Sequence, residues 1–155
     1  MSAGATDAGT RLGAQPFFAG WEGDLLRRLD PQVVERNYAA GAPLLREGGP
    51  ADRFLLLLEG KVALEIVLPD RPPITVQTLG AGEVIGWSWL VAPHQWRVDA
   101  RAVKPTRTLE VPGTSLRAAL DASPSDGYRF LLRLLPVIAG RLEHTRIQLL
   151  DLHAH

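Results

Sequence analysis

The sequence contains no cysteine, which excludes disulfides, thiolate metal sites and cysteine nucleophiles. It also has no excess charge of either sign, because 17 basic residues balance 17 acidic ones. No overall field would therefore attract the chain to nucleic acid or to an anionic membrane, and any anion site must be local. Its longest apolar runs, such as residues 54–58, fall far short of the roughly 20 residues that span a bilayer.

The length of 155 residues is enough for one well-buried core but too short for two ordinary domains and a linker. Residues 1–14 lack the apolar segment of a signal peptide, and their first basic residue is Arg11, so a cytoplasmic location is expected. Residues 1–15 are rich in glycine, alanine and threonine and are expected to form a disordered tail. The folded domain is then expected to cover residues 16–155.

The middle of the chain has the pattern of a mainly β domain. Between residues 33 and 112, short β-prone runs are separated by glycine, proline and aspartate, which predicts a sandwich or barrel of short strands. Glu59 and Gly60 are expected to join two of these strands as a hairpin, because glycine permits the positive φ of a tight turn. The expected strands are residues 33–38, 43–46, 53–58, 62–68, 74–79, 96–103 and 106–111.

Helical periodicity marks both ends of the β region. Apolar residues at helical spacing predict a short helix over residues 17–29 and another over residues 115–122. Ser123, with Pro124 at the first helical position, begins a long helix that is expected to run to about Leu152. Pro136 lacks an amide hydrogen and is expected to bend this helix and divide it in two.

The long helix carries a seam of residues at heptad spacing. The favoured interpretation is a homodimer interface, and the alternative is that the stripe packs on its own β domain. Arg133, Arg141 and Arg146 flank the seam and are expected to form a solvated face. The seam consists of Leu135, Ile138, Leu142, Thr145, Leu149 and Leu152.

Glycines and acidic residues of the β region recur in a recognisable order. The pattern GxxLxxEGxxADxFxxLxxGxV covers residues 41–62, LGxGExIG covers residues 79–86, and ARA follows at residues 100–102. Together they resemble the cyclic nucleotide-binding domains that serve as effector domains of the cAMP receptor protein and FNR regulators. The resemblance extends over about residues 25–152.

This resemblance implies a mainly β fold with flanking helices: a double-stranded β-helix, the cupin-like jelly-roll or β-roll, followed by a long C-terminal helix. In regulators of the family, that helix dimerises and leads into a helix-turn-helix domain. The chain ends at His155, so the sequence predicts no helix-turn-helix domain and no direct contact with nucleic acid.

The segment after Gly86 corresponds to the family's phosphate cassette but lacks its charged side chains. The resemblance implies a short helix that presents backbone amides, a glutamate for the ribose, and an arginine followed by serine or threonine for the phosphate. Trp87 stands at the glutamate position, Trp96 at the arginine position, and Arg97 where serine or threonine is expected. A one-residue shift would bring Arg97 to the phosphate, although strand alternation points it away from Trp96.

The candidate site therefore has three open interpretations: a pocket for a cyclic nucleotide, a pocket for another small effector stacked on the indoles, or a pocket filled by its own tryptophans. The last would leave a scaffold for protein interaction. The candidate ligand-binding residues are Gly86, Trp87, Ser88, Trp89, Trp96 and Arg97.

The leading hypothesis is a stand-alone regulatory or sensor module whose β-roll binds a small effector. The alternatives are a non-sensing accessory subunit that docks on a protein partner, and a transcriptional regulator of the family without its own DNA-binding domain. Neither a cofactor nor a metal is expected, because the four histidines include no strand pair like that of metal-binding cupins. No enzymatic activity is expected either, since Gly86-x-Ser88 lacks the closing glycine of a nucleophile elbow.

Overall fold

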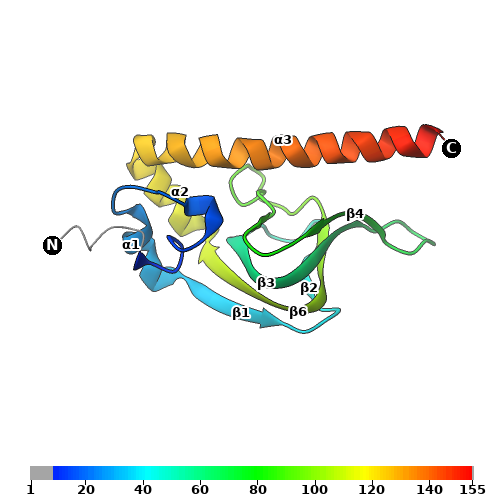
Figure 1. Ribbon diagram of the computed structural model, residues 1–155, viewed down its shortest axis with the longest axis horizontal. Coiled ribbons are helices and arrows are strands. Elements are labelled where there is room, and N and C mark those ends of the chain that lie inside the picture. The colour runs from blue at the N-terminus through cyan, green and yellow to red at the C-terminus, as the bar shows by residue number, and fades with distance from the viewer. Residues whose placement is uncertain (1–8, 155) are drawn as a thin grey trace.

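Six strands form one antiparallel sheet that rolls up on itself, and a long helix lies along one side of the roll (Figure 1). The computed structural model describes residues 9–154. The sheet has the order β1-β6-β3-β4, with β2 added to β6 and β5 added to β3. The strands are β1 (Val34–Tyr38), β2 (Pro43–Leu45), β3 (Arg53–Ile66), β4 (Ile74–Leu79), β5 (Val84–Ile85) and β6 (Asp99–Pro112). The expected β-roll is thereby confirmed.

Two long strands, β3 and β6, replace four of the short strands that the sequence predicted. Their pairing shifts register near Leu57, Glu59 and Lys61, so the strands continue through bulges and do not turn back at Gly60. A Cβ on Gly60 would lie 2.4 Å from the Thr106 hydroxyl oxygen, which explains the glycine. The predicted hairpin at this position is wrong: the glycine permits a close approach between the paired strands β3 and β6.

The helices differ from the prediction at the N-terminal side. The expected helix over residues 17–29 is divided into a 3-10 turn and the short helix α1, because Gly20 and Gly23 adopt φ angles of 70° and 106°. The helical elements are η3 (Pro16–Phe18), α1 (Leu25–Leu29), η4 (Asp30–Gln32), α2 (Gly113–Ala122) and α3 (Pro124–Ala154). Pro136 does not divide α3, which runs unbroken and nearly straight (Figure 1). Pro136 and Leu132 are both exposed, so water can satisfy the carbonyl that loses its amide partner.

The segment before Pro16 is packed on the domain where the structure describes it. Leu12 is buried in the core, and Arg11 donates hydrogen bonds of 2.9 Å to the carbonyls of Asp30 and Val33. The expectation of a disordered tail through residue 15 is therefore wrong for residues 9–15, and residues 1–8 lie outside the described part. One buried leucine and one arginine with two carbonyl partners hold this segment on the domain although its mean hydropathy is low.

An aromatic cluster fixes the first half of α3 to the roll. The rings of Phe17, Phe18, Phe54, Trp89 and Phe130 pack with centroid separations of 5.0 to 6.2 Å. They come from the N-terminal segment, β3, the loop after β5 and α3. From residue 142 onward α3 has no buried side chain in the described part, so its second half is less tightly held than its first.

A buried carboxylate, Glu110, joins β1, β3 and β6 on another side of the roll. It accepts hydrogen bonds from Tyr38 at 2.6 Å and from Thr108 at 2.8 Å. Its Oε1 also lies 2.8 Å from Arg53 Nε and 3.1 Å from Arg36 Nε. Both guanidinium groups thus pair with the same buried carboxylate.

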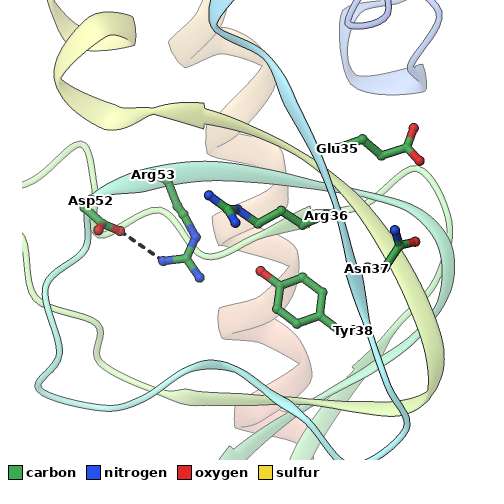
Figure 2. A pocket seen from close by; sticks show the side chains of 6 residues that line it. All are labelled: Glu35, Arg36, Asn37, Tyr38, Asp52 and Arg53. Atoms are coloured by element: carbon green, nitrogen blue, oxygen red, sulfur yellow. Dashed lines mark hydrogen bonds and ion pairs between the residues drawn. The ribbon is translucent and has the colours of Figure 1, made fainter.

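An open depression of about 570 Å³ lies over this network (Figure 2). Its lining residues are Glu35, Arg36, Asn37, Tyr38, Asp52 and Arg53. Arg53 also pairs with Asp52 at 3.0 Å and donates to the Leu44 carbonyl at 2.7 Å. Because its arginines are already paired, we assign this depression a structural role.

Stability at alkaline pH should depend on Tyr38. Burial, together with its hydrogen bond to Glu110, raises the pKa of Tyr38 above its ordinary value of 10.0. This contribution to stability is complete below pH 10 and is lost as the pH rises through the raised pKa. Urea unfolding between pH 8 and 11 should therefore show a smaller alkaline loss for Tyr38→Phe than for wild type. Tyr128→Phe, which removes an exposed hydroxyl, is the control, and equal alkaline losses in wild type and Tyr38→Phe would contradict the assignment.

Candidate functional site

A cavity of about 200 Å³ lies between the roll and the second half of α3. Its walls come from β3, β4, the loop that follows β5, and α3. The lining residues are Leu64, Val76, Gln77, Gly86, Trp87, Ser88, Trp96, Arg97, Val98, Arg141 and Thr145. The structure thus brings together five of the six predicted ligand-binding residues: Gly86, Trp87, Ser88, Trp96 and Arg97.

The loop of residues 86–98 is held by backbone contacts and by one close approach. Trp96 donates an amide hydrogen bond to the Gly49 carbonyl at 2.9 Å and accepts one from Gly48 at 2.8 Å. A Cβ on Gly86 would lie 2.9 Å from the Trp96 ring, so glycine lets this indole close the cavity floor. The loop forms turns, with the Leu90 amide bonded to the Trp87 carbonyl, and the short helix implied by the resemblance is absent from residues 86–98.

Trp89 does not line the cavity. It is fully buried in the aromatic cluster, with ring centroids 5.5 Å from Phe54 and 5.7 Å from Phe130. The three tryptophans that lie close in sequence are therefore divided between two environments. Trp87 and Trp96 face the cavity, whereas Trp89 holds the loop onto the core.

The cavity wall also includes Arg141, a cation that the sequence predicts to lie on a solvated face. Arg141 is only 6% exposed, and its Nη2 donates a hydrogen bond to the Val84 carbonyl. Its Cζ lies 5.6 Å from the Trp87 ring centroid, within the range of a cation–π contact. Its Nη1 is buried without a hydrogen-bond partner. The sequence does contain a signal for the burial of Arg141, which is helical spacing. Arg141 lies one heptad after Leu134, which is buried, and so shares its helix face.

Burial has a measurable electrostatic consequence for this arginine. Desolvation lowers the pKa of Arg141 to about 10, and the nearby charge of Glu83 opposes this shift. The guanidinium therefore remains charged at neutral pH. The Glu83 carboxylate accepts the Gly80 amide at 2.7 Å, and Arg141 forms no ion pair with any carboxylate of the described residues. By contrast, Arg97 is exposed at the edge of the cavity.

The predicted heptad seam is divided between two faces of α3. Leu135, Leu142, Leu149 and Leu152 are exposed, with Leu142 70% accessible. Ile138 packs against the core, and Thr145 lines the cavity. Leu135 and Leu142 thus remain exposed for a partner, whereas Leu149 and Leu152 line a hollow of about 490 Å³ between the roll and α3, together with Thr145, Ile66 and Ile74.

No group of three or more histidine, aspartate or glutamate side chains in residues 9–154 could hold a metal ion. No helix in the same part of the chain is long and apolar enough to cross a bilayer.

An antiparallel roll, a glycine-containing loop and a C-terminal helix with a cavity between them define the class of β-roll domains. Within that class, the chain belongs to the cyclic nucleotide-binding domain family, whose model matches residues 35–123. This match confirms the resemblance seen in the sequence.

Known proteins similar to the chain include both solved structures and longer proteins. A cyclic nucleotide-binding protein of Geobacter metallireducens superposes with a TM-score of 0.73 at 28% identity, covering 85% of this chain and 96% of that one. The CRP-like cAMP-activated global transcriptional regulator of Mycobacterium tuberculosis is 25% identical over 88% of this chain, which spans 59% of the regulator's length. Glutaminase 1 of Bradyrhizobium diazoefficiens is 29% identical over 86% of this chain, which spans 21% of that protein.

Proposed function

We propose that the chain is a cytoplasmic regulatory module that senses a small effector other than a cyclic nucleotide. The observation that carries this proposal is the cavity itself, which stays open although Trp87 and Trp96 replace the acidic and cationic groups expected from the family resemblance. Its volume of about 200 Å³ lies below the roughly 300–1,000 Å³ of pockets for drug-sized ligands. A small effector fits this volume better than a nucleotide does.

The position of α3 supports a relay from the cavity to the helix. Arg141 and Thr145 on α3 form part of the cavity wall, so an effector would contact the roll and the helix together. A second hollow of about 250 Å³ lies on another side of Arg141, against Pro16 and Phe17 of the N-terminal segment. An effector that binds one arrangement of Arg141 more tightly than another would shift the helix by that difference in affinity.

The output of the module is proposed to be a homodimer formed through the exposed apolar face of α3. This function requires neither catalysis nor direct nucleic-acid contact by the domain. A second candidate is an accessory module that docks on an enzyme. The similarity to one fifth of a glutaminase favours that alternative.

The sensing role can be tested by tryptophan fluorescence, because Trp87 and Trp96 both line the cavity. A panel of small metabolites, cAMP, cGMP and cyclic di-GMP would be titrated into the full chain. We expect at least one small metabolite to change the emission, and Trp87→Phe to remove much of that change. If no compound at millimolar concentration alters either emission or melting temperature, the accessory module becomes the better interpretation.

The dimer can be tested with a charge on the exposed face of α3. Leu142→Asp would bury carboxylates at the interface, and we expect the mass measured by light scattering to fall from dimer to monomer. Ile147→Asp is the matched control, because Ile147 is exposed on α3 but lies five positions along the heptad from Leu142, off the seam. An identical mass for wild type and Leu142→Asp would remove the α3 dimer.

A further inference from the structure

We infer that the effector is a small monocarboxylate with an apolar, planar body, and that Arg141 binds its carboxylate. This inference rests on the proposed sensing function and names the chemistry of the same cavity. The family resemblance places anion binding in the loop after β5, whereas we place it on Arg141 of helix α3.

The Arg141 guanidinium is buried with only part of its hydrogen-bonding capacity used. Arg141 is buried and charged, and it satisfies Nη2 on the Val84 carbonyl while Nη1 has no partner. A buried donor without an acceptor is unfavourable, and a buried cation without an anion more so. A carboxylate in the cavity would supply the opposite charge, and a small turn of the Arg141 side chain would let it accept a hydrogen bond from Nη1, which is closed off from solvent in this arrangement.

The buried part of the site can neutralise one negative charge. Among the described lining residues, Arg141 and Arg97 are the cations, and only Arg141 is buried. Phosphate monoesters carry nearly two negative charges at neutral pH, whereas a carboxylate carries one. One buried guanidinium therefore matches a monoanion, and a carboxylate fits its planar donor geometry. The phosphodiester of a cyclic nucleotide is also a monoanion, but the cavity of about 200 Å³ favours the smaller carboxylate ligand.

The rest of the cavity wall is mainly apolar. Two indoles, Trp87 and Trp96, and three aliphatic side chains, Leu64, Val76 and Val98, surround the cation. Such a surface favours a flat apolar group, which can stack on an aromatic ring. Trp87 already contacts the guanidinium, so ring and cation present one continuous surface to the ligand.

Benzoate and benzamide make a direct test, because the two differ in charge but hardly in shape. Isothermal titration calorimetry of the full wild-type chain should show saturable binding of benzoate and about 10- to 100-fold weaker binding of benzamide. Arg141→Met should weaken benzoate by a similar factor, while Arg97→Ala, which removes the exposed cation, should change it less than about twofold. Because benzoate and benzamide are compared on the wild-type chain, this part of the test does not depend on whether a variant folds.

The outcomes separate this inference from the proposed function. Absence of benzoate binding, or equal binding to wild type and Arg141→Met, would overturn the carboxylate assignment. The sensor proposal would survive that result if the metabolite panel contained a neutral effector that changed tryptophan emission equally in both proteins. If benzoate and the entire panel were silent, both proposals would fail.

Discussion

The Arg141→Met variant is expected to unfold at a higher temperature than wild type when no effector is present. A pKa lowered from 12.5 to about 10 corresponds to roughly 3 kcal/mol of unfavourable charge burial. Methionine keeps the apolar contacts of the site but loses the hydrogen bond to the Val84 carbonyl, so the net gain should be about 1–2 kcal/mol. For a domain of this size, that gain raises the melting temperature by about 2–8 °C.

Differential scanning calorimetry of wild type and Arg141→Met at pH 7 measures this difference. Arg133→Met is a suitable comparison, because Arg133 lies on the same helix but donates to the Phe17 carbonyl and stacks on Trp21. That variant should lose stability or remain unchanged. If Arg141→Met is less stable than wild type, the arginine has a structural role, and its burial says nothing about a ligand.

Glu110→Ala is expected to lower the free energy of unfolding by about 3–5 kcal/mol, which is typical for removal of one partner from a buried ion pair. Glu110 is 3% exposed and is the common acceptor for Arg36, Arg53 and Tyr38. Its loss would leave two guanidinium groups without this carboxylate and two hydroxyl groups without their acceptor. The strands β1, β3 and β6 would lose the side chain that links them through hydrogen bonds and ion pairs.

Urea denaturation of Glu110→Ala should be compared with that of Glu35→Ala. Glu35 pairs with Arg107 at 2.9 Å, but both side chains are more than 40% exposed, so this pair should contribute less than about 1 kcal/mol. Losses of equal size in the two variants would contradict the central role of Glu110.

The β-roll could be predicted because its signals are local. Alternating apolar residues mark the strands, and positive-φ glycines such as Gly41, Gly48 and Gly82 mark the turns between them. The same local signals gave Gly60 the wrong role, since a glycine needed for a close approach between two paired strands looks like a turn glycine in the sequence. Only the Thr106 contact from a distant strand distinguishes the two uses.

The cavity was predicted less completely, because its composition depends on tertiary contacts. Spacing along the loop grouped Trp89 with Trp87 and Trp96, but contacts with Phe54 and Phe130 direct it into the core. Arg141 was missed because a charged residue on a long helix is normally solvated. Its burial results from the position of α3 over the roll, which no local pattern specifies.

The central claim is that this member of the family keeps the cavity while lacking the groups that recognise a cyclic nucleotide. Calorimetric titration of the full chain with cAMP tests it most directly. The account predicts no saturable heat up to millimolar cAMP at pH 7. Saturable binding with a micromolar Kd would contradict it, and would mean that the loop of residues 86–98 rearranges to place Arg97 on the phosphate.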